Sequence, residues 1–194
     1  MTEFRDPTGL GRAATVALCV YMALKGLFAI MLLESSLEDP LVGLLAILYL
    51  VALLVCYVLV GCWIYRTNAN AHLFSSAMSI TPGWSIGWFF VPFANLVMPF
   101  RGVQETWQES HAFAGRMEER DSPLLRWWWG LWLATNIVSN FASLLGRNPS
   151  TGQGEAYFNL ISAALSVATS LVLIQLMTRL NRAQLAASHG GVFA

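Results

Sequence analysis

Lys25 is the residue that an apolar environment would tolerate least. It lies in the middle of AATVALCVYMALKGLFAIMLL, residues 13–33, and no Asp or Glu shares that run. An ammonium group at the centre of a bilayer costs on the order of 2.5–3.5 kcal/mol, and such groups are candidates for function. Two interpretations are open. Lys25 bonds to backbone carbonyls or extends to the interface, or it binds an anionic or carbonyl-bearing ligand.

The histidines and two clustered carboxylates raise the question of metal or redox chemistry. His72 follows an apolar run, His111 shares a polar stretch with Glu105 and Glu109, and His189 lies near the end of the sequence. The two glutamates fall one helical turn apart, a spacing that usually marks a solvated helix face. A metal site built from His72, His111 and one glutamate is the weaker alternative. We therefore predict no metal and no other cofactor.

Neither the short sequence motifs nor the cysteines indicate a catalytic or metal site. The sequence lacks the short motifs of serine hydrolases, zinc peptidases and P-loop NTPases. Cys19, Cys56 and Cys62 lie in apolar runs without the spacing of metal ligands, so we interpret them as small apolar side chains. The sequence thus favours a protein that is not an enzyme.

Composition places these residues in a membrane protein. Hydrophobic residues make up 56% of the chain and charged residues 11%, against roughly 45–50% and about 25% in soluble domains. About 20 apolar residues cross about 30 Å of hydrocarbon as a helix. Four runs predict such helices, at residues 13–33, 41–63, 124–145 and 157–177. We expect one all-α membrane domain over residues 1–182 and a flexible tail over 183–194.

The stretch TPGWSIGWFFVPFANLVMPFRG, residues 81–102, is as apolar as a span but contains three prolines and three glycines. A proline inside a helix removes an amide and unpairs a carbonyl, at about 3 kcal/mol or more. Lipid offers those groups no replacement partner. We predict a re-entrant or interfacial element over 79–100 and then a surface helix over 101–118, with Arg101 and Glu105 paired across one turn. A proline-kinked fifth span is the alternative.

The arginines favour four spans with both termini in the cytoplasm, because short cytoplasmic loops carry the excess of Lys and Arg. Four spans leave only Arg147 on the outer side, whereas a fifth span would divide the arginines almost evenly. All eight tryptophans lie between the end of the run 41–63 and the start of the run 124–145. They are expected to form an aromatic cap on the cytoplasmic side.

Several motifs in this region occur in a fixed order. They are Trp63-Ile64-Tyr65-Arg66 with Asn70, then Pro82-Gly83-Trp84, Gly87-Trp88, Pro92, Asn95-Leu96 and Pro99, then Glu105 with Trp107. The order resembles the bacterial membrane family called domain of unknown function 4328, over roughly residues 40–180. Thr81 stands where that family has Ser, which would still allow a hydroxyl cap. The resemblance implies a multi-span protein of the bacterial cytoplasmic membrane and brings no known activity.

The residues and the resemblance together predict a non-enzymatic module that binds a partner protein or lipid through the aromatic cap. We expect Arg66 or Arg101 to bond to carbonyls or carboxylates of the cap, because a guanidinium offers five donors. The candidate binding residues are Lys25, Arg66, Asn70, Trp84, Trp88, Asn95, Arg101, Glu105 and Trp107. Expected partners are membrane lipids, a protein or a second copy of the chain, and no nucleic acid, since the net charge is zero.

Two other functions stay open. Small and amide side chains follow one side of the runs 124–145 and 157–177. This pattern indicates close helix packing, but it would also suit a small transporter or channel in which Lys25 attracts anions and 84–100 forms a re-entrant filter. The second alternative is a membrane redox or lipid-modifying enzyme that uses His72, His111, Glu105 and Glu109.

Overall fold

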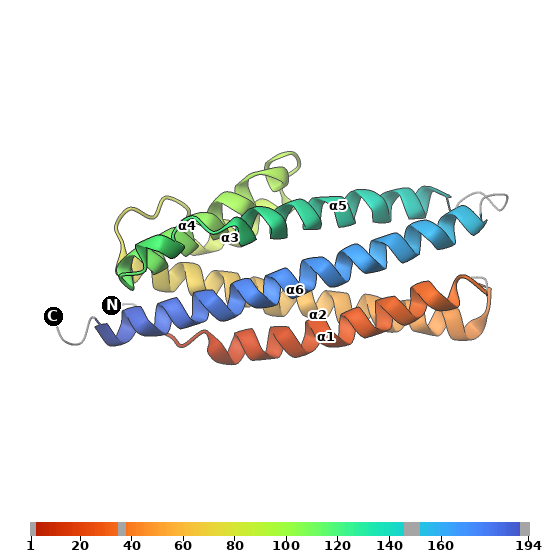
Figure 1. The fold of residues 1–194 in the computed structure, drawn as a ribbon, viewed down its shortest axis with the longest axis horizontal. Coiled ribbons are helices and arrows are strands. Elements are labelled where there is room, and N and C mark those ends of the chain that lie inside the picture. Colours follow the sequence, from red (N-terminus) through yellow and green to blue (C-terminus); the bar gives the residue numbers. More distant parts are fainter. Residues whose placement is uncertain (1–2, 35–37, 146–151, 191–194) are drawn as a thin grey trace. The chain divides into compact units, whose positions relative to one another are not determined.

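A computed structural model describes residues 3–34, 38–145 and 152–190 (Figure 1). Over these ranges the chain forms helices and no strand. The long helices are α1 (Thr8–Met31), α2 (Pro40–Phe74), α4 (Met98–Phe113), α5 (Pro123–Leu145) and α6 (Gly152–Gly190). The short ones are α3 (Pro82–Gly87) and three 3₁₀ turns, η1 (Trp88–Phe90), η2 (Ala94–Leu96) and η3 (Met117–Glu119).

A proline marks the start of several helices, because its missing amide would have no helical partner there. At α2 and α5 the residue before the proline supplies a cap for the next free amide. Asp39 accepts from the Leu41 amide at 2.8 Å, and Ser122 accepts from the Leu124 amide at 3.4 Å. Thr81 does not act this way. Its side chain makes no cap hydrogen bond, and its backbone carbonyl accepts from the Ser85 amide at 2.9 Å.

Within the described ranges, three helices are long and apolar enough to cross a membrane: Thr8–Met31, Pro40–Phe74 and Ala156–Ser188. They fit the membrane protein expected from composition. Helix α5 has 23 residues, but it is absent from this group because its tryptophan, asparagine and serine residues lower the mean hydropathy.

Two helices continue well past the predicted spans. Helix α2 ends at Phe74 rather than residue 63, and α6 ends at Gly190 rather than residue 177. The flexible tail predicted from residue 183 therefore differs from the structure. Ala183, Gln184 and Ala187 are buried, so the last turns of α6 gain packing that a free tail would lack. Residues 191–194 lie outside the described ranges.

The chain divides into two compact units. Unit 2 comprises Thr15–Tyr57 and the described part of Trp127–Leu173. Its apolar core includes Phe28, Leu32, Val42, Leu45 and Ala156, from α1, α2 and α6.

Hydroxyl pairs also join the helices of unit 2. Ser139 and Ser162 lie 2.6 Å apart, and Thr135 and Thr169 lie 3.2 Å apart, so the small polar side chains of α5 and α6 bond to each other. This is the helix contact that their spacing predicts.

Unit 1 comprises the described parts of Met1–Ala14, Val58–Arg126 and Ile174–Ala194. Helix α4 buries one face in it, with positions three and four residues apart. The buried residues of α4 are Pro99, Gly102, Val103, Thr106, Trp107, Ser110 and His111. Three of these seven residues, Thr106, Ser110 and His111, are polar, so the interior of unit 1 has to supply hydrogen-bond partners.

Candidate functional site

The polar interior of unit 1 is organised by two buried amides, Asn70 on α2 and Gln184 on α6. Asn70 Nδ2 donates to Gln184 Oε1 at 3.0 Å and to the carbonyl of Arg5 at 2.8 Å. Gln184 Nε2 donates to the carbonyl of Thr67 at 2.7 Å and to Ser110 Oγ at 3.0 Å. The network connects the segment before α1 to α2, α4 and α6. Buried networks of this kind hold a unique arrangement when their members are satisfied.

Two further contacts extend the network along α2. Trp63 Nε1 donates to Asn181 Oδ1 at 2.9 Å, and Asn68 Nδ2 donates to Thr106 Oγ1 at 3.0 Å. Asn68 is fully buried, and its Oδ1 has no hydrogen-bond partner in the structure. Trp63 and Asn70 of the sequence motif therefore lie on the inner side of unit 1.

Glu105 satisfies the backbone that leads into α3. Its two carboxylate oxygens accept from the amides of Ser79 at 2.6 Å and Ile80 at 3.0 Å. His72 Nε2 lies 3.1 Å from the carbonyl of Ile80, so this nitrogen carries the proton and donates. The helix-surface ion pair predicted between Arg101 and Glu105 is not among the described ion pairs, because the carboxylate bonds to amides instead.

The arginines play a smaller part than expected. Arg66 Nη1 lies 3.5 Å from the carbonyl of Asp6, in the segment before α1. Arg101 is exposed. Glu105 and His72 thus hydrogen-bond to the start of the 79–100 element, at Ser79 and Ile80, whereas the Arg66 guanidinium bonds to the segment before α1.

The element predicted over 79–100 forms α3, η1 and η2 before α4 begins. Its tightest point is Phe93, with φ 63° and ψ −42°. The Ala94 amide donates to the Pro92 carbonyl at 2.8 Å, which closes a three-residue γ-turn around Phe93. A γ-turn with positive φ is rare and strained. For a bulky residue such backbone is an outlier, and strained residues of this kind cluster at functional sites.

The large apolar side chains around that turn are exposed and do not pack in the core. Phe90 is 82% exposed and Phe93 is 87% exposed. Trp84, Leu96 and Val97 are about half exposed, and Trp84 packs on Trp88 with ring centroids 4.5 Å apart. We call residues 82–97 the aromatic loop. It presents a large apolar surface to its surroundings.

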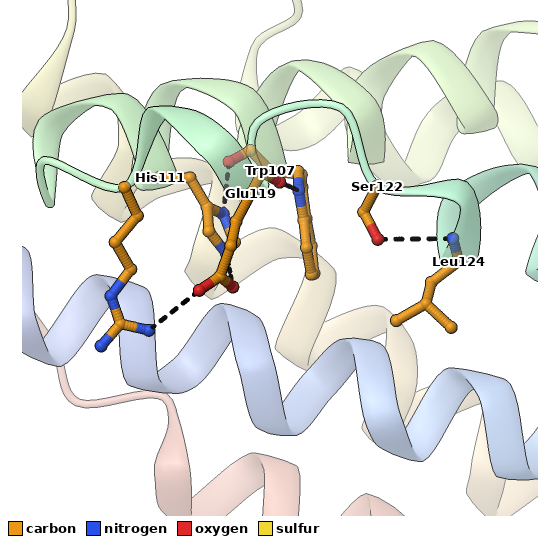
Figure 2. A network of polar contacts seen from close by, with 6 residues as sticks. Trp107, His111, Glu119, Ser122 and Leu124 are labelled. Carbon is orange, nitrogen blue, oxygen red and sulfur yellow. Dashed lines mark hydrogen bonds and ion pairs between the residues drawn. The ribbon is translucent and has the colours of Figure 1, made fainter.

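His111 has an unusual environment within α4 (Figure 2). Its ring stacks on Trp107 with centroids 4.1 Å apart, and Nδ1 donates to the Trp107 carbonyl at 2.8 Å. Nε2 is buried, has no hydrogen-bond partner, and faces Glu119 Oε2 at 3.6 Å. Burial lowers the pKa of His111. The Trp107 carbonyl and Glu119 oppose this shift, and the charges of Arg116 and Arg179 add to it.

The turn that carries Glu119 is held against α4 by a second set of contacts. Trp107 Nε1 donates to the Glu119 carbonyl at 2.8 Å, and Gln108 Nε2 donates to Asp121 at 3.0 Å. Arg116 Nη1 lies 3.8 Å from Glu119 Oε1. Glu119 therefore lies between the buried imidazole and an exposed guanidinium.

The structure places the predicted site residues in three environments. Asn70 and Trp107 lie in the buried polar interior of unit 1, and Glu105 lies beside it. The exposed aromatic loop carries Trp84, with Trp88 and Asn95 half-buried in it.

Lys25 belongs to unit 2. It is half-buried, and its Nζ lies 5.8 Å from the ring centroid of Tyr49. The two described ion pairs do not involve it.

The two candidate metal ligands have different neighbours. His72 bonds to Ile80, and His111 bonds to Trp107. Within the part of the chain that the structure describes, no three His, Cys, Asp or Glu side chains come together as a group that could hold a metal ion. His189 lies in α6, and its side chain is outside the description.

Several residues of the site were missed by the sequence reasoning. Asn181 follows the predicted span 157–177, and Gln184 falls in the predicted tail 183–194. The buried positions Met177, Leu180, Gln184 and Ala187 nevertheless continue the helical spacing of the apolar run. That spacing in the sequence could have indicated a longer buried helix. The sequence gives no comparable indication of the turn at Phe93, because no residue type encodes a γ-turn at a phenylalanine.

The all-helical fold with apolar helices of spanning length defines a membrane-type protein. The family model "Domain of unknown function (DUF4328)" matches residues 28–183. The chain therefore belongs to the DUF4328 family, which confirms the resemblance seen in its motifs. No curated protein and no solved structure gives a significant match.

Proposed function

We propose that the protein is a non-enzymatic module of the bacterial cytoplasmic membrane that binds lipid or a partner protein through the aromatic loop. The single observation that carries the proposal is the pair Phe90 and Phe93. Both are almost fully exposed, and the second is held out by a strained turn. Soluble surfaces rarely present large contiguous apolar patches, and such patches mark interaction sites.

In the proposed topology four helices cross the membrane and both termini are cytoplasmic. The parts of α1, α2, α5 and α6 that belong to unit 2 are roughly 20 residues each, which matches about 30 Å of hydrocarbon. The loop arginines other than Arg147 then share the cytoplasmic side. The tryptophans of α5 fit the headgroup layer, which suits an amphipathic ring.

The test compares what co-purifies with the wild-type protein and with a Phe90→Ala, Phe93→Ala double variant. Both proteins would be extracted from native membranes in lipid nanodiscs and analysed by mass spectrometry for proteins and lipids. We expect the double variant to lose one bound species while keeping its thermal stability, because neither ring packs in the core. A Met117→Ala variant, altered at a residue 61% exposed outside the loop, is the matched control. Identical profiles for all three proteins would refute the proposal.

A further inference from the structure

We propose that the occupant of the aromatic loop is phospholipid, with Phe90 and Phe93 inserted at the headgroup and acyl boundary of the bilayer that holds the protein's own helices. The inference rests on the proposed function in one respect, that the long apolar helices cross a membrane. It goes further by naming the partner. Four observations within unit 1 support it.

The first observation is the level of the loop along α2. A methyl group built at Gly61 would lie 4.0 Å from Ile86 Cδ1, so α3 packs beside this position of α2. Gly61 lies at the end of the apolar run 41–63. When that run fills the hydrocarbon, Gly61 and α3 lie where the hydrocarbon meets the headgroups.

The second observation is the surface of α2 next to Gly61. Val58 is 65% exposed and Tyr65 is 50% exposed. The apolar, exposed surface of α2 thus continues to the level of the aromatic loop. A tyrosine at that point is typical of a membrane interface, because its ring is apolar and its hydroxyl is polar.

The third observation is the chemistry of the loop. No charged residue occurs from Thr81 to Phe100, and the next residue, Arg101, is exposed. A protein-binding surface normally has a polar rim that supplies hydrogen bonds. Here the exposed groups are rings and aliphatic chains, followed by one guanidinium that suits a phosphate. This combination fits a phospholipid better than a protein.

The fourth observation is the backbone at Phe93. The strained turn and the η1 turn before it leave two phenylalanine side chains exposed only three residues apart. In Figure 1 the chain between α3 and α4 forms a loop that projects outward from these helices. A strained loop that exposes its largest side chains needs a medium that accommodates them, and the acyl boundary does so without requiring a complementary shape.

The experiment places the photoreactive residue p-benzoylphenylalanine at position 90 or 93, which keeps an aromatic side chain at a site without core contacts. Matched protein carries it at Met117. Each protein would be irradiated in native membranes and, after purification, in vesicles of phosphatidylglycerol and phosphatidylethanolamine. Adducts would be identified by mass spectrometry, with thermal melting as the check of folding.

We expect phospholipid adducts at positions 90 and 93 in both settings, and at least tenfold fewer at position 117. Protein adducts at 90 and 93 in native membranes, without lipid adducts in vesicles, would overturn the lipid assignment and leave the proposed function standing. No adduct of either kind would overturn both. Equal lipid labelling at 117 would also overturn the inference, because the contact would then not be specific to the loop.

Discussion

Glu105 and His111 are two ionisable residues of α4 with opposite kinds of surroundings. The carboxylate of Glu105 accepts from two backbone amides, one at each oxygen. The imidazole of His111 is buried on Trp107 and leaves Nε2 without a donor or acceptor in hydrogen-bond range. Both polar atoms of the Glu105 side chain therefore have partners, whereas one ring nitrogen of His111 has none.

His111 makes stability depend on pH. Its folded-state pKa is lowered, chiefly by burial, so below about pH 6.5 the unfolded chain binds the proton more readily than the folded chain. The contribution of the neutral His111 imidazole to the free energy of unfolding is therefore complete above that pH. It is lost as the pH falls and the unfolded chain takes up the proton. We expect the melting temperature of the detergent-solubilised protein to decrease between pH 7.5 and pH 5.

A His111→Gln variant should show a flatter pH dependence over the same range, and a His72→Gln variant should keep the wild-type decrease. Parallel curves for wild type and His111→Gln would show that another group is responsible.

The glutamates of α4 allow a matched comparison. Glu105→Gln removes one of two carboxylate oxygens and turns a donor toward a backbone amide. We expect a loss of about 1–2 kcal/mol in the free energy of unfolding, reduced by partial exposure. Glu109→Gln, on the same helix and also half-buried, should change it by less than about 0.5 kcal/mol. Chemical denaturation of both variants measures the difference, and equal effects would exclude the role given to Glu105.

At the scale of elements, the first turns of α1 lie against the last turns of α6. Gly11 is buried, and a methyl group there would lie 2.5 Å from Asn181 Nδ2 and 3.6 Å from Asn181 Cγ. Asn181 is short and already bonded to Trp63, so it cannot move aside without breaking that bond. The approach of the two helices thus depends on the absence of a side chain at one position.

Two glycines of α1 separate this effect from helix propensity. Gly11→Ala should lower the free energy of unfolding by about 1–3 kcal/mol, because the buried Trp63 and Asn181 groups lose their partner. Gly9→Ala, where nothing lies within 4 Å, should be neutral or stabilise by up to about 1 kcal/mol. Thermal unfolding of both variants tests this, and stabilisation by both would mean that Asn181 can shift freely.

At the scale of the whole molecule, the proposed four-span topology separates two exposed residues. Glu38, just before α2, should face outward, and Met117, in η3, should face the cytoplasm. In a background with Cys19, Cys56 and Cys62 replaced by Ser, we expect a membrane-impermeant maleimide to label Glu38→Cys in intact cells. Met117→Cys should react only after the cells are permeabilised. Labelling of both residues in intact cells would favour the fifth span.

The sequence predicted the helical class, the family and the break at 79–100, because proline, glycine and long apolar runs act locally. It did not predict that α2 and α6 continue past their apolar runs. Their last turns are stabilised by contacts such as Gln184 with Asn70, which join residues more than a hundred positions apart. For the same reason the sequence pairs Glu105 with its helix neighbour Arg101, whereas in the structure it accepts from the amides of Ser79 and Ile80, which lie 26 and 25 residues earlier.

The network around Asn70 has a consequence for proteolysis. Asn70 holds the backbone of Arg5 on one side and Gln184 on the other, so segments near opposite ends of the sequence depend on one amide group. Truncation at residue 183 would remove Gln184 and leave Asn70 with one bond fewer. The segment before α1 should then become more sensitive to proteases that cleave at Arg5, although the deleted residues lie at the other terminus.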